Sequence, residues 1–376
     1  YEICLSDWSS DVCSSDLWMI NEFRLTPVAT MVNCWGRGGE TLKALYAFIV
    51  VILMRLLLMT RGYHFLPRQC MEFELLSAID RCDMIWMVGG GYLNDLGAVE
   101  ARGVLATAWL GQQSGRPVAM TGQGLGPFTS SMTKRLFRAV ALKSKSIILR
   151  EPTAGVKELR ALGDSKILWS PGVDDACSLP ATLNDLAGPA CLALHFRRST
   201  FHAHGGYLER DFLQLMQCLI ERGEKVKLFV FSERKSYELA VYEEWIRCLG
   251  DTDAVTIVQD SDPRKLLAEL RTCRCAIGMA YHFHLFALLS GIPSLAMCSG
   301  EYYESKYEGI DTLFGQSRSF VNYLDVNEKM IGDFVASNNP SKSCVIDYLK
   351  SRSSILRASA DTQILNTLDI MTGKMV

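Results

Sequence analysis

Short runs of apolar and β-branched residues alternate with helical patterns along most of this 376-residue chain. The runs that we expect to form strands are residues 28–34, 84–88, 117–121, 146–149, 166–170, 191–196, 225–231, 254–258, 275–279 and 293–297. Helical patterns lie between them, most clearly at residues 209–222, 263–271 and 282–290. Strand and helix in repeated succession are typical of a parallel sheet that helices cover on both faces. The sequence therefore predicts an α/β fold.

A polar, less regular stretch interrupts this alternation near residues 180–190. The chain length fits about two domains of roughly 100–200 residues each. We predict an N-terminal Rossmann-like domain over residues 19–185 and a C-terminal one over residues 186–376. The second ends in a helical tail, residues 326–376, which can cross back to the first domain. Two doubly wound domains of this kind face one cleft, with ligand groups at the carboxyl ends of the strands.

The N-terminal segment differs from the rest of the chain. Residues 7–17 read Asp-Trp-Ser-Ser-Asp-Val-Cys-Ser-Ser-Asp-Leu and resemble a translated sequencing-library adapter. This resemblance implies non-biological sequence joined to a gene fragment. The segment also lacks the basic start and the long apolar run of a signal peptide. Residues 1–18 are therefore left out of the fold prediction.

An uncharged, strongly apolar segment covers residues 44–54, between Lys43 and Arg55. A membrane-spanning helix needs about 20 apolar residues, so this segment is too short to span a bilayer. We predict a buried helix here. An interfacial helix that rests on a membrane is the alternative, because Arg61 and Arg68 extend the basic flank.

The charge balance argues against a nucleic-acid-binding protein, and the cysteines indicate a reducing compartment. The chain has 39 basic and 41 acidic residues, for a net charge of −2, and the two signs alternate. It thus lacks the basic surface that binds a nucleic-acid backbone. The 13 cysteines are scattered without a Cys-x-x-Cys pair, which is typical of reduced thiols in a cytosolic protein. We expect a cytoplasmic protein, with contact to the inner face of the membrane and homo-oligomerisation as further options.

Two glycine-rich segments follow predicted strands. Their glycines and polar neighbours are Gly89, Gly90, Gly91 and Asp95 in the first, and Gly122, Gln123, Gly124 and Gly126 in the second. Glycines allow a ligand close to the backbone and leave amide N–H groups to bind an anion or a hydroxyl oxygen. A tight turn between strand and helix is the alternative. Neither segment has the spacing of a dinucleotide or nucleoside-triphosphate motif.

Two arginines end predicted strands, Arg150 in the first half of the chain and Arg197 in the second. A guanidinium in such a place can hold a carboxylate or a phosphate through two hydrogen bonds. The alternative for both is an ion pair within the protein, which for Arg150 would involve Glu151 or another carboxylate.

The histidines are His64, His195, His202, His204, His282 and His284. Residues two apart do not share a helix face, and no Asp, Glu or Cys accompanies the histidine pairs at a familiar metal-binding spacing. We therefore predict no metal site. His282 lies where the strand at residues 275–279 turns into the next helix, and a histidine there can act as an acid or base near pH 7. A structural role at the helix start is the alternative.

The order of the motifs resembles the polysaccharide pyruvyl transferase family from about residue 28 to residue 310. The segments that carry this resemblance are Gly36-Arg37-Gly38-Gly39-Glu40, Gly89-Gly90-Gly91, Gly122-Gln123-Gly124-Leu125-Gly126-Pro127, Arg150-Glu151, Ala280-Tyr281-His282 and Tyr303-Glu304-Ser305-Lys306. The family often shows Arg-Leu-His where this chain has Ala280-Tyr281-His282.

The resemblance implies a fold similar to two-domain glycosyltransferases, and transfer of pyruvate from phosphoenolpyruvate to a sugar as a cyclic ketal. The acceptor would belong to a cell-surface glycan precursor, as a sugar or a lipid-linked oligosaccharide, and the reaction would need no metal or nucleotide cofactor. The residues it implies for catalysis and donor binding are His282, Lys306, Arg150, Arg197 and Tyr281. Those for acceptor binding are Gly36, Gly89, Gly90, Gly91, Asp95 and Gln123.

Two other functions stay open at this point. One is a nucleotide-sugar glycosyltransferase of the same architecture. The other is an inactive homologue that binds a glycan or a protein partner, which Ala280 in place of the family's arginine motivates.

Overall fold

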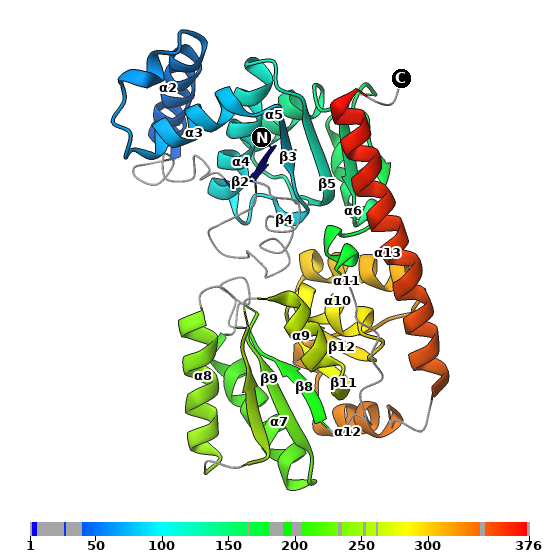
Figure 1. The fold of residues 1–376 in the computed structure, drawn as a ribbon. Coiled ribbons are helices and arrows are strands. Elements are labelled where there is room, and N and C mark those ends of the chain that lie inside the picture. The colour runs from blue at the N-terminus through cyan, green and yellow to red at the C-terminus, as the bar shows by residue number, and fades with distance from the viewer. Residues whose placement is uncertain are drawn as a thin grey trace. The chain divides into compact units, whose positions relative to one another are not determined.

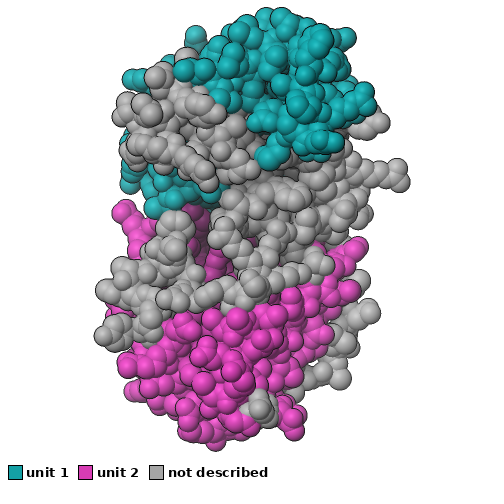
Figure 2. Space-filling view, turned by 90° about the vertical axis from the view of Figure 1, so that its left-hand side faces the viewer, with its two compact units in different colours: residues 1–12, 16–176, 359–376 teal, residues 13–15, 177–358 magenta. Residues whose placement is uncertain are grey.

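The computed structural model describes residues 2–5, 26–27, 40–163, 165–179, 191–197, 205–231, 235–250, 253–260, 262–338 and 343–373. They form two compact units, coloured teal and magenta in Figure 2. Unit 1 contains the described residues of 1–12, 16–176 and 359–376, and unit 2 contains those of 177–358. Helix α13 (Ser343–Thr372, red in Figure 1) contributes to both units. The predicted C-terminal tail is therefore divided, and the predicted boundary at residues 180–190 lies outside the described residues.

Unit 1 contains a parallel sheet. Its strands are β1 (Glu2–Leu5), β2 (Thr26–Pro27), β3 (Met84–Met87), β4 (Gly90–Leu93), β5 (Val118–Leu125), β6 (Ser146–Leu149) and β7 (Ser170–Pro171). Their order is β2-β1-β3-β5-β6-β7, and β4 pairs with β5. Three predicted strands are found as β3, β5 and β6. The strand predicted at residues 166–170 is reduced to β7, residues 28–34 lie outside the described part, and β1 falls in the segment that we left out.

The helices of unit 1 are α2 (Glu40–Met59), η2 (Gly62–Phe65), α3 (Met71–Arg81), α4 (Ala98–Gln113), α5 (Ser131–Ala141) and α6 (Pro152–Ala161). The local sequence explains where two of these helices begin. The side chain of Ser130 accepts hydrogen bonds from the first-turn amides of α5, and α6 begins at Pro152, which has no N–H to leave unpaired. The short η3 (Asp175–Ser178) follows β7.

Helix α2 is buried on one face only, which corrects the prediction of a buried helix. Val51, Met54 and Leu58 are buried in the core of unit 1, but the opposite face of the same helix is exposed. None of the helices in the described residues is long and apolar enough to span a bilayer.

Unit 2 contains a second parallel sheet. Its strands are β8 (Cys191–His195), β9 (Lys225–Phe229), β10 (Val255–Val258), β11 (Cys273–Gly278), β12 (Ser294–Cys298) and β13 (Phe320–Asn322). Their order is β10-β9-β8-β11-β12-β13, which counted from β8 is the 3-2-1-4-5-6 order of Rossmann sheets. The order reverses between β8 and β11. The predicted α/β fold with parallel sheets is confirmed, although we did not predict β13.

The helices of unit 2 are α7 (Gly205–Glu221), α8 (Lys235–Cys248), α9 (Pro263–Leu270), α10 (Tyr281–Leu289), α11 (Glu301–Phe314), η4 (Tyr323–Asp325), α12 (Glu328–Ser337) and the first part of α13. Aromatic packing between α7 and α8 closes one side of the sheet, where the rings of Phe212 and Trp245 stack at 5.5 Å. Helix α9 starts as predicted, with Asp262 accepting from the Arg264 amide and Pro263 in the first turn.

Candidate functional site

The point where the strand order of unit 2 reverses brings two predicted segments together. His195 and Gly278, the last residues of β8 and β11, are register partners. Arg197 lies two residues beyond β8, and Ala280 lies two residues beyond β11 as the N-cap of α10. Ligands of open parallel sheets bind at this position, outside the carboxyl ends of the strands. The structure therefore places Arg197 beside the start of α10.

The start of α10 offers an electrostatic site for an anion. No side chain caps its first turn, because the N-cap residue is Ala280. The first amides of a helix lack partners within the helix and carry the positive end of the helix dipole. Anions bind readily at such a helix terminus. Together with the guanidinium of Arg197, it favours a ligand with negative charge.

Tyr307 of α11 connects Arg197 to the segment that leads into α10. Its hydroxyl donates a hydrogen bond of 2.7 Å to the carbonyl oxygen of Met279, directly before Ala280. Burial raises the pKa of Tyr307 well above its usual value, and the positive charge of Arg197 acts on this hydroxyl in the opposite direction. Tyr307 thus holds the backbone that leads into α10 in place, and it lies close enough to Arg197 to feel its positive charge.

His282 is the second residue of α10 and is half-buried. Its ring lies edge-on to the ring of Tyr281 at 5.3 Å and near that of Phe286 at 6.0 Å. Two of the predicted side chains, Tyr281 and His282, therefore occupy the first turn of α10, at the same edge of the sheet as Arg197.

Lys306 lies on α11, which packs against α10. Its ammonium nitrogen is 4.2 Å from the centre of the Tyr302 ring and 5.8 Å from that of Tyr303. Cation–π contacts of this kind hold a lysine in place while it keeps its positive charge. Helix α11 follows β12, the strand next to β11, so Lys306 belongs to the same side of the sheet as His282.

His284, two residues after His282, has a structural role. It is fully buried, and its two ring nitrogens lie 2.8 Å from the Ser294 hydroxyl and 2.9 Å from the Ser319 hydroxyl. Burial lowers the pKa of His284 to about 3. The imidazole is therefore neutral at physiological pH and joins α10 to the β12 and β13 region.

We expect this neutral histidine to make the stability of unit 2 fall in mild acid. The folded-state pKa of His284 lies below the unfolded value of about 6.5, so its stabilising effect is complete above pH 6.5 and is lost as the pH falls toward 3. At pH 5 the loss amounts to about 2 kcal/mol. Urea unfolding at pH 7 and pH 5, followed by hydrogen exchange of the α10 amides, measures it. His284→Gln should remove most of this pH dependence and exposed His64→Gln should not; equal behaviour of the two variants would contradict the assignment.

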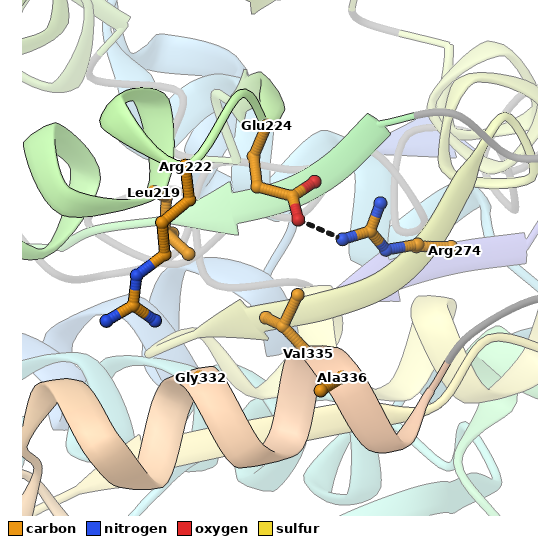
Figure 3. Close-up of a pocket in the computed structure, with 7 residues that line it drawn as sticks. All are labelled: Leu219, Arg222, Glu224, Arg274, Gly332, Val335 and Ala336. Carbon is orange, nitrogen blue, oxygen red and sulfur yellow. Dashed lines mark hydrogen bonds and ion pairs between the residues drawn. The ribbon is translucent and has the colours of Figure 1, made fainter.

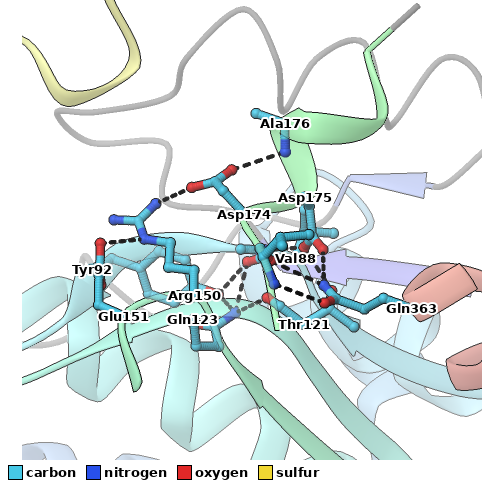
Figure 4. A network of polar contacts seen from close by, with 12 residues as sticks. Val88, Tyr92, Thr121, Gln123, Arg150, Glu151, Asp174, Asp175, Ala176 and Gln363 are labelled. Carbon is cyan, nitrogen blue, oxygen red and sulfur yellow. Dashed lines mark hydrogen bonds and ion pairs between the residues drawn. The ribbon is translucent and has the colours of Figure 1, made fainter. Parts of the chain in front are cut away.

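Unit 1 contains a buried polar network that joins the segments after β3 and β7 to residues within β5 (Figure 4). Its centre is Asp175, which accepts hydrogen bonds from the Gly89 amide at 2.8 Å, the Thr121 hydroxyl at 2.6 Å and the Gln363 side chain at 2.9 Å. Burial raises the pKa of Asp175 to about 6. Gln363 comes from α13 and also bonds both backbone groups of Val173. This network fixes the strand ends and attaches the C-terminal helix to them.

One of the glycines predicted for ligand binding, Gly89, packs closely against the backbone of this network. A Cβ atom at Gly89 would lie 2.7 Å from the carbonyl oxygen of Gly122, and Gly122 itself has φ +57° beside Asp175. The Gly89 amide already donates to Asp175. Gly90 and Gly91 belong to β4, where Gly90 is the register partner of Gln123. The segment that could have formed a tight turn, the alternative left open from the sequence, is thus a short strand.

Gln123 is fully buried and supports the same strand ends. Its side-chain nitrogen donates to the carbonyl oxygens of Met87 and Val88 at 3.0 and 2.9 Å. These carbonyls directly precede Gly89. Gln123 therefore positions the glycine segment, rather than presenting its amide nitrogen at the surface.

Arg150 adopts the alternative left open from the sequence, an ion pair inside the protein. Its side chain is 2% exposed and binds two carboxylates, Glu151 at 2.8 Å and Asp174 at 2.6 Å. Gly124 makes room for this pair, since a Cβ there would lie 2.5 Å from a Glu151 oxygen. The charge of Arg150 is thus matched within unit 1.

The two remaining residues predicted for acceptor binding are Asp95 and Gly36. The carboxylate of Asp95 accepts hydrogen bonds from the amides of Thr129 and Ser130 and from the Thr133 hydroxyl, and so supports the beginning of α5. Gly36 lies outside the described residues. We did not single out Asp174, Asp175 or Gln363 from the sequence. The acidic pair that begins four residues after the predicted strand at 166–170 was the available signal.

A groove of about 470 Å³ lies elsewhere on unit 2 (Figure 3). It is lined by Leu219, Arg222, Glu224, Arg274, Gly332, Val335 and Ala336. Glu224 precedes β9, and Arg274 is near the start of β11, where it donates a hydrogen bond to Glu224. The groove is therefore at the amino edge of the sheet, opposite the edge that carries Arg197 and His282.

Within the described residues, no group of three His, Cys, Asp or Glu side chains is arranged to hold a metal ion.

Comparison with known families decides the family of this protein. The profile described as polysaccharide pyruvyl transferase matches residues 35–297, which is most of the chain. The chain belongs to the polysaccharide pyruvyl transferase family. The resemblance stated from the motifs is thereby confirmed, and the family is one of transferases. No functionally curated protein matches the chain in sequence.

Several solved structures share the fold of this family member. S. aureus MnaA with UDP has a TM-score of 0.59 at 12% identity, covering 100% of this chain and 96% of that one. The UDP-GlcNAc 2-epimerase from Neisseria meningitidis bound to UDP-GlcNAc has a TM-score of 0.51 at 12% identity, covering 80% and 82%. Sucrose-phosphate synthase from Thermosynechococcus elongatus has a TM-score of 0.51 at 15% identity, covering 83% and 79%. The predicted fold, with two Rossmann-like domains as in two-domain glycosyltransferases, is confirmed.

Proposed function

We propose that this family member transfers pyruvate from phosphoenolpyruvate to a sugar of a cell-surface glycan precursor, as a cyclic ketal. The observation that carries the proposal is the edge of the unit 2 sheet, where Arg197, the uncapped start of α10 and His282 lie together. Phosphoenolpyruvate has a carboxylate and a phosphate, so its site needs several positive groups. Arg197, Lys306 and the amides of α10 can supply them.

The proposed reaction needs two proton movements. Two sugar hydroxyls add to the central carbon of the donor, its bond to the phosphate oxygen breaks, and the methylene carbon becomes a methyl group. One hydroxyl proton goes to that carbon and the other leaves with the phosphate. We assign the transfer to the methylene carbon to His282, because an imidazole can give and take a proton near neutral pH. Phosphoenolpyruvate is a co-substrate here, and the scheme uses no metal or nucleotide.

Unit 1 would contribute the acceptor side. Its glycine segment and Gln123 are set by the Asp175 network, so we propose that this network holds the acceptor loops in shape. Arg150 acts as a positioning residue in the same way, because its charge is bound to Glu151 and Asp174. A cytoplasmic location fits a donor that is a cytosolic metabolite.

The donor can be tested by thermal unfolding with phosphoenolpyruvate. A ligand at about 100 times its Kd stabilises the native state by about 2.7 kcal/mol, so the melting temperature of unit 2 should rise. Arg197→Met and Lys306→Met should each reduce the rise, whereas Lys265→Met, an exposed position on α9, should leave it unchanged. A rise with uridine diphosphate and none with phosphoenolpyruvate would contradict the proposal.

A rise in melting temperature with uridine diphosphate alone would favour a nucleotide-sugar enzyme. The S. aureus MnaA structure, which has the same fold, contains UDP. Uridine diphosphate is therefore the control ligand. Saturable glycan binding without turnover of either donor would instead indicate an inactive binding homologue.

A further inference from the structure

Helix α2 exposes an apolar face to solvent. The exposed fractions are 47% for Ile49, 53% for Leu53, 52% for Leu56 and 62% for Met59. Ile49, Leu53 and Leu56 follow each other at spacings of four and three, which places them on one side of a helix. Figure 1 shows α2 beside α3 at the periphery of unit 1.

The turn that follows α2 adds an aromatic ring to this face. Phe65, in η2, is 94% exposed. Helix α2 and η2 contact each other, so this exposed ring lies near the C-terminal end of α2. We call Ile49, Leu53, Leu56, Met59 and Phe65 the α2 face.

Positive charge lies at one end of the α2 face. Arg61 precedes η2 and Arg68 follows it, and both side chains are exposed. Arg61, whose side chain is 74% exposed, lies 3.8 Å from the carboxylate of Asp80, which is 24% exposed and also accepts a hydrogen bond from the Tyr63 hydroxyl. Arg55, the one charged residue between Ile49 and Met59, is directed to the flank, with its guanidinium 5.7 Å from the centre of the Trp109 ring. The face itself is apolar and its rim at the η2 end is basic.

An exposed apolar surface of this kind marks an interaction site. We propose that the α2 face binds the surface of a membrane that contains anionic lipids. Apolar and aromatic side chains on one side of a helix, with arginines at their rim, are the features of helices that lie in the interface of a bilayer. Each arginine near an anionic surface adds to the attraction.

A second copy of the chain fits the same face less well. In a two-fold dimer the same patch meets itself. The basic rim of one copy would then approach the basic rim of the other, and like charges repel. Anionic headgroups supply the opposite charge.

This inference goes beyond the proposed reaction and does not depend on it. The α2 face lies on unit 1, and the donor site that we propose lies on unit 2, so each can be tested without the other. A membrane-bound transferase would meet an acceptor sugar that is carried on a lipid at a high local concentration.

Co-sedimentation of the full chain with vesicles tests the proposal. Wild-type protein should bind vesicles of phosphatidylglycerol and phosphatidylcholine, and bind vesicles of phosphatidylcholine alone more weakly. Leu53→Glu with Leu56→Glu should weaken binding about tenfold or more, because two apolar side chains lose their burial. Arg61→Gln with Arg68→Gln should weaken it several-fold and reduce its sensitivity to salt.

The matched control is Leu168→Glu, which changes another exposed leucine of unit 1 and should leave vesicle binding unchanged. The four changed positions on and around the face are at the surface, so circular dichroism should show folded variants. Absence of wild-type binding to the anionic vesicles would overturn the proposal, as would equal binding by the Leu53/Leu56 double variant. A wild-type dimer in light scattering that the double variant breaks, without vesicle binding, would assign the face to a second copy.

Discussion

His282→Ala is expected to lower the rate of pyruvyl transfer by about 100- to 10,000-fold, the range for loss of a general acid or base. The physical reason is that the methylene carbon of the donor is a poor base, so its protonation needs an acid held beside it. His282 sits in the first turn of α10, at the reversal point of the unit 2 sheet. The measurement is phosphate release from phosphoenolpyruvate with a panel of sugars that carry neighbouring hydroxyl pairs, and NMR detection of the ketal methyl group.

Isotope incorporation makes this test specific. In D2O the wild-type product should contain one deuterium in each ketal methyl group, because one solvent-exchangeable proton adds to the methylene carbon. His282→Ala should still show the thermal shift with phosphoenolpyruvate, since Arg197 and Lys306 are intact. The control is His64→Ala, which removes an exposed histidine from unit 1 and should keep full activity. A His282→Ala rate within about threefold of wild type would exclude His282 as the acid.

Arg150→Met is expected to destabilise unit 1 by about 3–5 kcal/mol. The substitution keeps a long side chain but leaves the buried carboxylates of Glu151 and Asp174 without their cation. Buried charge without a partner is costly because the interior solvates it poorly. Urea unfolding of the full chain, with hydrogen exchange of the β5 and β6 amides, reports the change for unit 1.

Neutralising the carboxylates should recover much of this loss. Arg150→Met combined with Glu151→Gln and Asp174→Asn removes all three charges, so the penalty for unpaired charge disappears. Arg135→Met, on the exposed side of α5, should change stability by no more than about 0.5 kcal/mol. If Arg150→Met were as stable as wild type, the ion pair would not organise this part of unit 1.

These two experiments separate two kinds of positive group in this chain. Arg150 lies in a buried cluster whose carboxylates match its charge, and its replacement should act through folding. Arg197 and Lys306 lie at the edge of the unit 2 sheet, and their replacement should act on donor binding. A loss of donor binding by Arg150→Met at full stability would reverse this distinction.

Much of the fold could be predicted because its signals are local. The strand at residues 146–149 is found as β6 with the same ends, and α9 begins at Pro263 as its cap and proline indicate. Local signals failed where a long-range pairing decided the outcome. Gly90 joins β4 because Gln123 pairs with it across the sheet, and no pattern within residues 89–95 indicates a strand.

In the candidate site, too, local sequence predicted some features and long-range contacts decided the others. The sequence placed Arg197 and His282 at strand ends, and the parallel sheet brought those ends together because strands β8 and β11 are neighbours. Only one partner of Arg150 could be predicted. Glu151 is adjacent in the sequence, whereas Asp174 is 24 residues away. Gln363 reaches Asp175 over 188 residues, so its role could not be inferred from any local motif.

By itself, the sequence determined the α/β class, the order of strands and helices, and the family, because periodicity and motif order are properties of neighbouring residues. The tertiary structure alone decided which charges are matched and which side of α2 faces solvent. Both depend on contacts between segments that are distant in the chain. A buried ion pair and an exposed apolar face follow from the packing around a residue, and its neighbours in sequence carry little information about that packing.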